Sequence, residues 1–514
     1  MVDRIQEKND AWDVIIIGGG ATGIGAAIEA ASRGYKTLLL EQYDFGKGTS
    51  SRSTKMIHGG VRYLQQGNIK LVLEALRERG HLLNNAPHIV HSCSFVVPNY
   101  HWWEAPFYGT GLGLYDLLSG SLSLGRSRLI RREKVLELAP TIEPENLRGG
   151  VMYFDGQFDD TRLLINMAQT AAEHGAVLLN YMKVNRLVHA NSKVNGVIAK
   201  DLESEEELEL KAKVIINATG VFADEIRLMD NASARRMISP SQGVHIVLDH
   251  SFLPGNTAIM VPKTDDGRVL FAIPWQNYAV VGTTDTPVES IPIEPKPLEQ
   301  EIDFLLGHSS RYLAKDPAKE DILSTFAGLR PLVSLSREQN TKSISREHTI
   351  EISASGLVTV TGGKWTTYRK MAEDTIKKAA SLGGLPAKPS ITKTLKLHGY
   401  HTNSGEFGKL GIYGADAPLL RNVAKEKPEW NDFLHPDLQI QAVEVIWSVR
   451  HEMARTVEDF LARRRRVLFQ DARKSIEIAP KVAALMAEEM GYDNVWRDEQ
   501  VKTYTKLAEQ YLMK

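Results

Sequence analysis

The feature that most constrains this chain is a glycine-rich turn near its start. Residues 13–23 read Asp-Val-Ile-Ile-Ile-Gly-Gly-Gly-Ala-Thr-Gly, and an acidic residue, Glu41, follows eighteen positions later. Residues 14–17 form a short apolar run, which is typical of a buried parallel strand. Residues 21–32 are rich in alanine and favour a helix. The pattern therefore predicts a strand, a tight turn and a helix, with a second strand ending at Glu41.

The glycines of this turn and Glu41 each have a physical use in binding a dinucleotide. Gly18 permits the tight turn, Gly20 lets the backbone approach a pyrophosphate, and Gly23 lets the helix pack close to the strand. The first N–H groups of the helix then point at the phosphates. Glu41 is placed to accept hydrogen bonds from ribose hydroxyls, and its charge disfavours a 2′-phosphate. A helix-capping loop without a ligand would leave Glu41 unexplained.

Composition narrows the class of protein. A chain of 514 residues is too long for one core and predicts two or three domains. The single cysteine, Cys93, excludes an internal disulfide, a Cys-ligated zinc and an iron–sulfur cluster, so redox chemistry needs an organic cofactor. No His, Asp or Glu cluster has metal-ligand spacing, and we predict no metal. A net charge of -1 gives no global field for nucleic acid.

The first residues do not show the pattern of a targeting signal. Residues 1–11 are polar and lack the apolar core of a signal peptide, and the apolar stretch from Val14 is interrupted by glycines and by Glu29. We expect a cytoplasmic protein without a membrane-spanning helix.

Further segments predict the rest of the fold. A helix at 162–174 and a strand at 176–179 extend the first unit, and strands near 197–199 and 208–217 flank an acidic turn, the second ending in Ala-Thr-Gly at 218–220. Short strands separated by turns then predict an antiparallel sheet, a natural wall for a substrate pocket. These strands lie at 243–248, 258–261, 268–273 and 278–281.

The chain returns to the first style at 356–364, followed by a helix at 366–382. After Pro386 and Pro389, residues 438–472 and 479–491 read as helices. We therefore predict an α/β protein with a discontinuous Rossmann-like domain, an antiparallel-sheet domain and a helical C-terminal domain. The expected boundaries are 1–90, 150–238 and 349–383 for cofactor binding, 91–149 and 239–348 for substrate binding, and 384–514 for the helical domain.

The segment 48–64 carries the most specific chemistry. It holds serine and threonine hydroxyls that can bond a diphosphate, a His-Gly-Gly turn at 58–60 that permits close approach to a flat ring, and the pair Arg62-Tyr63. The alternative is a serine-rich surface loop, which the nucleotide-binding turn just before this segment disfavours. Three further segments, 328–332, 344–347 and 363–369, supply cations.

Several motifs in order resemble the FAD-dependent glycerol-3-phosphate dehydrogenases. The resemblance runs from about Trp12 to Leu382 and extends more loosely to the tail. It is carried by the turn at 18–23, Thr-Ser-Ser at 49–51, and the segments 55–64, 273–275, 282–285, 328–331 and 362–369.

This resemblance implies a two-dinucleotide-fold flavoprotein with FAD that oxidises sn-glycerol 3-phosphate to dihydroxyacetone phosphate. A hydride would pass from C2 to flavin N5, and the electrons would go on to a quinone-type acceptor. His58 is the first choice for the base, although an arginine-assisted or water-mediated route stays open. Arg330 and Arg346 match positions near the phosphate, Arg62 lines the same pocket, and Lys364 would stabilise negative charge on the flavin N1–C2=O edge.

The predicted site residues fall into three sets. The catalytic set is His58, Arg62, Arg330 and Lys364, and the substrate-binding set is Arg62, Tyr63, Arg330, Arg346, Lys364, His245 and Trp275. Because it stands in an apolar strand, His245 fits a buried, hydrogen-bonded wall residue better than it fits the catalytic base. Trp275 and Tyr63 fit a packing role as well as they fit a substrate contact. The cofactor-binding set is Gly18, Gly20, Ala21, Thr22, Gly23, Glu41, Thr49, Ser50, Ser51, Ser53, Lys55, His58, Gly59, Gly60, Ala218, Thr219, Gly220, Gly362, Gly363, Lys364, Trp365 and Thr366.

The tail contains four consecutive arginines, 463–466, followed by Val-Leu-Phe. On a helix they would point all around it, so a solvated or ion-paired face is favoured over contact with anionic lipid. Because members of the family pass electrons to membrane quinone, residues 463–469 are nevertheless the candidate for a peripheral contact at the cytoplasmic face of the inner membrane. A homodimer is left open.

Other functions compete with this interpretation. A glycerol-3-phosphate oxidase that uses oxygen is the nearest, although such oxidases resemble longer chains with an insertion. A related flavin amine or amino-acid oxidase would call for fewer cations than this sequence offers. A flavin-bound binding module without turnover would have no need for a cationic pocket facing the ring.

Overall fold

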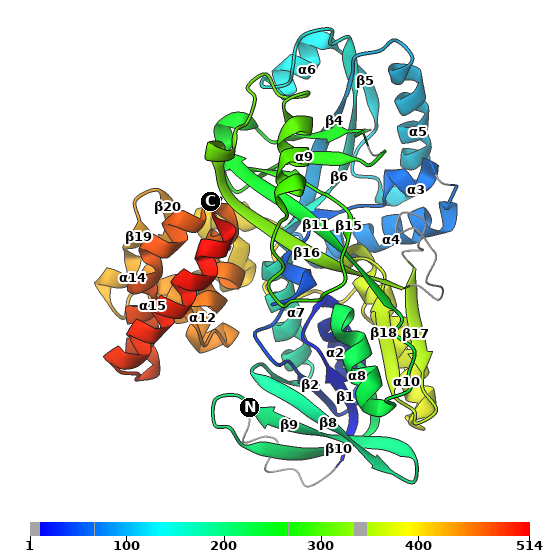
Figure 1. The fold of residues 1–514 in the computed structure, drawn as a ribbon, viewed down its shortest axis with the longest axis vertical. Helices are drawn as coiled ribbons and strands as arrows, with labels where there is room; N and C mark the ends of the chain where they lie inside the picture. Colours follow the sequence, from blue (N-terminus) through cyan, green and yellow to red (C-terminus); the bar gives the residue numbers. More distant parts are fainter. Residues whose placement is uncertain (1–10, 66, 263, 266, 334–346, 514) are drawn as a thin grey trace.

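The protein is described by a computed structural model that covers residues 11–65, 67–262, 264–265, 267–333 and 347–513, with the backbone alone for Arg62, Gln65 and Ser121. It has three parts (Figure 1): one mixed sheet with its helices, a second sheet above it, and a helical part on one side. Among the described residues, no helix is long and apolar enough to cross a bilayer.

The first part is built on a mostly parallel sheet. Its central strand β1 pairs in parallel with β2 and β10, and these pair in turn with β7 and β18. Alternate residues of the apolar strands are buried on opposite faces, as expected where both faces are covered. The strand bounds are β1 Trp12–Ile17, β2 Thr37–Leu40, β7 Val177–Leu179, β8 Met182–Ala190, β9 Lys193–Asp201, β10 Glu207–Asn217, β17 His348–Ile352 and β18 Val358–Gly362.

Three helices cover one face of this sheet. The helix α2 (Ala21–Ser32) lies beside α7 (Asp160–Glu173) and α10 (Tyr368–Leu382), and all three contribute to one core with the strands. A shorter helix, α8 (Ala223–Asp230), follows β10. The predicted α/β fold with a discontinuous Rossmann-like domain is confirmed, because segments far apart in the sequence build this one sheet.

The second part is a sheet of ten strands in the order β15-β11-β14-β13-β12-β4-β6-β3, with β16 on β11 and β5 on β6. The strands β3 and β6 belong here, although our boundaries assigned their residues to the cofactor domain. The bounds are β3 Met56–Ile57, β4 Val90–Asn99, β5 Arg128–Arg131, β6 Gly149–Phe158, β11 Ile238–Asp249, β12 Thr257–Val261, β13 Leu270–Trp275, β14 Tyr278–Gly282, β15 Thr286–Pro287 and β16 Ile322–Val333.

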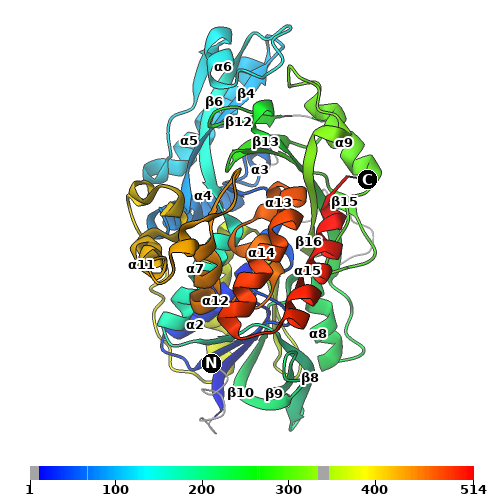
Figure 2. The ribbon, with the colours of Figure 1, turned by 90° about the vertical axis from the view of Figure 1, so that its left-hand side faces the viewer.

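Helices flank this second sheet (Figures 1 and 2). The apolar helix α5 lies beside the strands and contacts the helices α3 and α4, which follow the His-Gly-Gly turn in the sequence. The bounds are α3 Val61–Gln65, α4 Ile69–Asn85, α5 Glu104–Ser119, α6 Arg132–Leu138 and α9 Glu299–Ser309.

The C-terminal part differs from the continuous helix expected over residues 438–472. That segment begins with a strand, and its first helix ends at Glu452, before Met453, which has a positive φ of 57°. A π-helical turn, Asp459–Arg464, and a second positive φ at Arg466 follow. The bounds are α11 Ala417–Val423, β19 Phe433–His435, β20 Leu438–Gln441, α12 Ala442–Glu452, α13 Val467–Gln470, α14 Ala472–Met490 and α15 Asn494–Ala508.

Candidate cofactor and substrate site

The glycine turn lies between β1 and α2, and its geometry requires glycine. Gly18 has a φ of 110°, and a Cβ there would lie 2.7 Å from the carbonyl oxygen of Ala218 on the neighbouring strand. A Cβ at Gly23 would lie 1.9 Å from the carbonyl oxygen of Gly18. Gly20 has no side chain to cap the helix, but Ser50 Oγ accepts the N–H of Ala21 at 3.0 Å, and this first turn borders the groove. The turn thus fits a phosphate at the helix N-terminus.

Glu41 is fixed at one end of the same groove. Its Oε2 accepts the backbone N–H of Gly19 at 2.6 Å, and its Oε1 accepts that of Tyr43 at 2.8 Å. Burial raises the pKa of the carboxyl group, which these two bonds oppose. The carboxylate is therefore held in one orientation, as a ribose-binding acid requires.

The groove gathers segments from across the sequence into one cavity of about 220 Å³. Its walls come from the glycine turn, the end of β2, the loop after it, the end of β10 and the turn after β18. The predicted cofactor residues that line it are Gly18, Gly20, Ala21, Thr22, Glu41, Thr49, Ser50, Ala218, Thr219, Gly220, Gly362, Gly363, Lys364 and Trp365. A helix N-terminus preceded by a glycine turn, a fixed carboxylate and a continuous groove fit an extended dinucleotide such as FAD.

A second cavity, also of about 220 Å³, adjoins the groove and shares Thr49 and residues 362–365 with it. The His58 backbone is bound to its wall, because the His58 N–H donates to Thr366 Oγ1 at 3.3 Å and that hydroxyl donates to the His58 carbonyl at 3.3 Å. Trp365 Nε1 donates to the Ser50 carbonyl at 2.9 Å. The His-Gly-Gly turn is thus joined to the turn after β18, where the two cavities meet.

Cationic side chains border this second cavity. Arg330, on β16, donates to Asp285 Oδ1 at 3.2 Å and to the Thr284 carbonyl at 3.0 Å. Lys364 Nζ lies 4.0 Å from the centre of the Tyr63 ring. Both line the cavity together with His58. The arrangement suits a small anionic ligand held beside the end of the groove.

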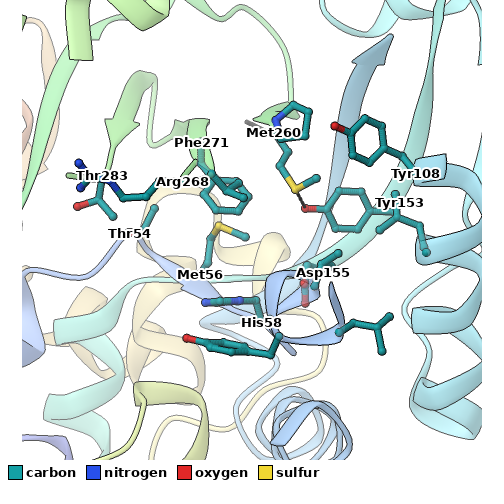
Figure 3. Close-up of a pocket in the computed structure, with 18 of the residues that line it drawn as sticks. Thr54, Met56, His58, Tyr108, Tyr153, Asp155, Met260, Arg268, Phe271 and Thr283 are labelled. Atoms are coloured by element: carbon teal, nitrogen blue, oxygen red, sulfur yellow. Dashed lines mark hydrogen bonds between the residues drawn. The ribbon is translucent and has the colours of Figure 1, made fainter. Parts of the chain in front are cut away.

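A third cavity, of about 700 Å³, extends from the same place toward α5. It shares Thr54, Met56, His58, Tyr63, Thr283 and Arg330 with the second cavity. Figure 3 shows His58 and Met56 on one side of it and the side chains of Tyr108, Tyr153 and Met260 on the other. The lining is mostly apolar toward α5 and polar toward His58.

His245 lies on the wall of the second cavity as a buried residue. Its Nε2 is hydrogen-bonded to Thr54 Oγ1 at 2.9 Å, and its ring stacks on Phe326. Burial, followed by the charges of Lys55 and Arg330, lowers its pKa well below 6.5. The imidazole is therefore neutral and a poor proton acceptor.

Two predicted ligand-binding side chains are elsewhere. Lys55 is fully buried, and its Nζ donates to Asp160 Oδ2 at 2.6 Å and to the Ser51 carbonyl at 2.9 Å. Trp275 is buried against the C-terminal part, 5.3 Å from Lys55 Nζ. Neither borders the cavities described above. Both predictions are corrected: these residues pack beneath the site.

Other predicted residues support the site from behind, line the second cavity, or are not fully described by the structure. Gly23 supports the turn, and Ser51 donates to the Gly48 carbonyl. Ser53 lines the second cavity, and its Oγ donates to Asp160 Oδ2 at 2.7 Å. Arg346 lies outside the described residues, and Arg62 is described only as part of α3.

Sequence reasoning missed three contributors. Arg52 and Thr54 line the second cavity, and Asp155 lines the third. Arg52 and Thr54 stand inside the hydroxyl-rich segment 48–64, so their position was a usable signal. Asp155 stands in a strand with no recognisable motif, and only the pairing of β6 with β4 brings it to the cavity.

Arg463, Arg464 and Arg466 are buried, Arg465 is partly buried, and all four are ion-paired, which corrects the membrane role considered for residues 463–469. Arg463 and Arg464 pair with Asp44 beside the groove, Arg465 pairs with Glu444, and Arg466 donates to the Ser51 carbonyl at 2.5 Å. The alternative of an ion-paired face is confirmed. Through these bonds the C-terminal part holds the loop that lines the cofactor groove.

Comparisons with known proteins agree with this geometry. A family model described as FAD dependent oxidoreductase matches residues 13–369, and one described as the C-terminal domain of alpha-glycerophosphate oxidase matches residues 390–497. The mitochondrial glycerol-3-phosphate dehydrogenase of Macaca fascicularis is 39% identical over 97% of this chain and 73% of that protein. That of Schizosaccharomyces pombe is 37% identical over 96% of this chain and 86% of that protein.

Solved structures are also similar to this fold. A glycerol-3-phosphate dehydrogenase from Bacillus halodurans complexed with FAD superposes with a TM-score of 0.81 and 28% identity, covering 99% of this chain and 97% of that one. An L-alpha-glycerophosphate oxidase from Mycoplasma pneumoniae with FAD bound, 17% identical with a TM-score of 0.57 over 76% of this chain and 99% of that one, shares the fold.

Proposed function

The chain belongs to the FAD-dependent glycerol-3-phosphate dehydrogenases, and from this membership we propose how its own residues oxidise sn-glycerol 3-phosphate to dihydroxyacetone phosphate. Bound FAD supplies flavin N5 as the acceptor of the hydride that leaves C2 of the substrate. The observation that carries the proposal is the cation-bordered cavity that opens where the dinucleotide groove ends.

The groove residues hold the cofactor from its ribose to its ring. Glu41 would accept hydrogen bonds from the ribose hydroxyls, and the N-terminus of α2 would bind the pyrophosphate. Lys364, at the turn shared by both cavities, would stabilise negative charge on the N1–C2=O edge of the ring.

The second cavity holds the substrate. Arg330 and Lys364 attract the phosphate, and an Arg fork suits its geometry. His58 takes the proton of the C2 hydroxyl as the hydride leaves, which balances the conversion of an alcohol to a ketone. His245, held neutral by its buried surroundings, orients the hydroxyl of the neighbouring Thr54.

Anaerobic addition of glycerol 3-phosphate to the holoenzyme tests this function. Rapid bleaching of the flavin absorbance is expected, while glycerol leaves the spectrum unchanged because it lacks the phosphate. Bleaching by an amino acid, with no response to glycerol 3-phosphate, would assign the chain to the amino-acid oxidases instead.

The electron acceptor in this proposal is a quinone. The third cavity is large enough for a quinone ring, is mostly apolar, and reaches His58 at its inner end. Turnover with a short-chain quinone and little turnover with NAD or dissolved oxygen would support it. The match to an oxidase C-terminal domain favours oxygen as the second candidate acceptor. Fast oxygen reduction with stoichiometric peroxide would assign the chain to the oxidases.

The helix α5 is the proposed site of a peripheral membrane contact in place of residues 463–469. Large apolar side chains on it and just before it are exposed, with Trp102 at 77% and Leu117 at 76%. Exposed basic residues follow in the sequence and suit anionic lipid. They are Arg126, Arg128, Arg131, Arg132 and Lys134.

Sedimentation with anionic vesicles tests this contact. It also tests the proposal that a cytoplasmic protein docks on the inner membrane. Leu117→Glu should release the protein from the vesicles. Val495→Glu, an equally exposed apolar position on α15, is the matched control and should leave binding unchanged. Equal binding of both variants would remove α5 from the contact.

A further inference from the structure

A buried tyrosine of α5 reaches the His-Gly-Gly turn. Tyr115 is 1% exposed, and its hydroxyl accepts the backbone N–H of Gly59 at 2.8 Å. The same hydroxyl donates to Asp155 Oδ2 at 2.7 Å. Asp155 Oδ1 in turn accepts from Arg79 Nη1 at 2.8 Å, with both side chains buried. A chain of hydrogen bonds therefore runs from the residue after His58 to a buried ion pair.

The direction of these bonds is fixed by chemistry. A phenol has one proton to give, and an ionised carboxylate can only accept. Burial, followed by the charge of Asp155, raises the pKa of Tyr115 well above 10, so the phenol stays protonated. The proton goes to Asp155, and a lone pair of the phenol oxygen remains for the Gly59 N–H.

The turn is packed closely against α4 and α5. A Cβ at Gly59 would lie 2.6 Å from both the Tyr115 hydroxyl oxygen and Leu76 Cδ2, so the backbone is already in close contact. On its other side the turn is bonded to Thr366 through the His58 backbone. His58 thus stands between two anchors, one from the cofactor-binding part and one from the second sheet and its helix.

We propose that Tyr115, held by Asp155 and Arg79, is a positioning residue that fixes His58 for proton removal. The inference rests on the proposed function, because it concerns the base of that reaction. Tyr115 does not line the cavities described above, so it acts through the turn. Without its hydroxyl, the Gly59 N–H and the Asp155 carboxylate each lose a buried partner, and the turn can shift.

Stopped-flow reduction of holoenzyme by glycerol 3-phosphate tests the proposal with Tyr115→Phe. The matched control is Tyr413→Phe, since Tyr413 is also 1% exposed and donates to a buried carboxylate, Glu444, in the C-terminal part. We expect the limiting rate of Tyr115→Phe to fall about ten-fold, with an apparent substrate constant within about three-fold of the wild type. Its pH profile should also shift on the limb that reports the base, while Tyr413→Phe keeps the wild-type rate and profile.

A wild-type rate and profile for Tyr115→Phe, counted per bound FAD, would overturn the proposal. So would an equal fall in both variants, which would indicate a general loss of packing. If glycerol 3-phosphate does not reduce even the wild type, the proposed function fails. The visible circular dichroism of the bound flavin then tests separately whether Tyr115 holds the turn. A change in Tyr115→Phe but not in Tyr413→Phe supports a turn that is held by this hydroxyl, and no change overturns it.

Discussion

Arg464 and Asp44, 420 positions apart in the sequence, form a fully buried ion pair with Nη1–Oδ2 and Nη2–Oδ1 distances of 2.7 and 3.0 Å. Arg463 reaches the same carboxylate with its Nε at 2.5 Å. Burial alone would raise the pKa of Asp44, but the two arginines lower it to about 2. Asp44 follows Glu41 by three residues, so this pair ties the C-terminal part to the end of the cofactor groove.

Replacing Arg464 with methionine should destabilise the protein strongly. The variant removes a buried charge and leaves Asp44 with one partner fewer, a change that costs about 3–5 kcal/mol when a buried pair is broken. Thermal unfolding followed at a fixed FAD concentration measures it. Arg450→Met is the control, since its pairs with Glu426 and Glu489 are at the surface and worth about 0–1 kcal/mol. Equal shifts of the two midpoints would contradict this account.

The difference between the predicted and observed tail has a physical origin. Local sequence shows four arginines and a helical pattern, but it does not show that the carboxylate of Asp44 lies beside them. That partner comes from the first sheet, and the bends at Met453 and Arg466 are needed to reach it. By contrast, the bounds of α2 agree with the prediction residue for residue, because glycines and apolar periodicity are local signals.

Glu41→Gln should weaken FAD binding without altering the fold. In the wild type the two carboxylate oxygens accept the backbone N–H groups of Gly19 and Tyr43. The amide oxygen can replace only one of these acceptors, and the amide NH₂ group would face the other N–H. We expect FAD to dissociate about ten-fold faster, equivalent to about 1.4 kcal/mol. Release of flavin fluorescence after dilution of the holoenzyme measures the rate. Glu429→Gln, at an exposed position, should release FAD at the wild-type rate.

Arg330→Ala should raise the apparent constant for glycerol 3-phosphate while the FAD content stays the same. Loss of a charge-assisted contact to phosphate costs about 1.5–3 kcal/mol, or about ten-fold to a hundred-fold in that constant. Steady-state kinetics with a dye acceptor measure it, and Arg497→Ala, a partly exposed arginine on α15 far in sequence from the site motifs, is the control. Normal substrate binding by Arg330→Ala would remove this residue from the site.

Site residues were predictable where a motif fixes a turn. They were not predictable on strands, where the packing of distant segments decides whether a side chain faces a cavity. His58, Arg330 and Lys364 meet at the second cavity as the motifs predict. Trp275 is the last residue of β13 and packs beneath helices that come about two hundred residues later in the sequence. Its burial therefore depends on the C-terminal part, which the sequence around Trp275 does not reveal.

Lys55 illustrates the same limit for charge. It is surrounded in the sequence by site residues, yet its partner Asp160 is 105 positions away, at the first turn of α7. A cation near a motif predicts a ligand only when no buried carboxylate competes for it, and that competition appears only in the folded chain.

His398 makes the contact of the C-terminal part with α7 dependent on pH. Its Nδ1 lies 2.5 Å from Glu173 and its Nε2 2.7 Å from Asp416. Burial opposes its charge, but the bonds to Asp416 and Glu173 raise its pKa above 6.5. Its stabilising effect is therefore fully present below pH 6.5 and is lost as pH rises through the raised pKa. The midpoint of thermal unfolding of the wild type should fall over that window, and His398→Gln should show a flatter profile. Parallel profiles for the two proteins would mean that His398 does not titrate in this contact.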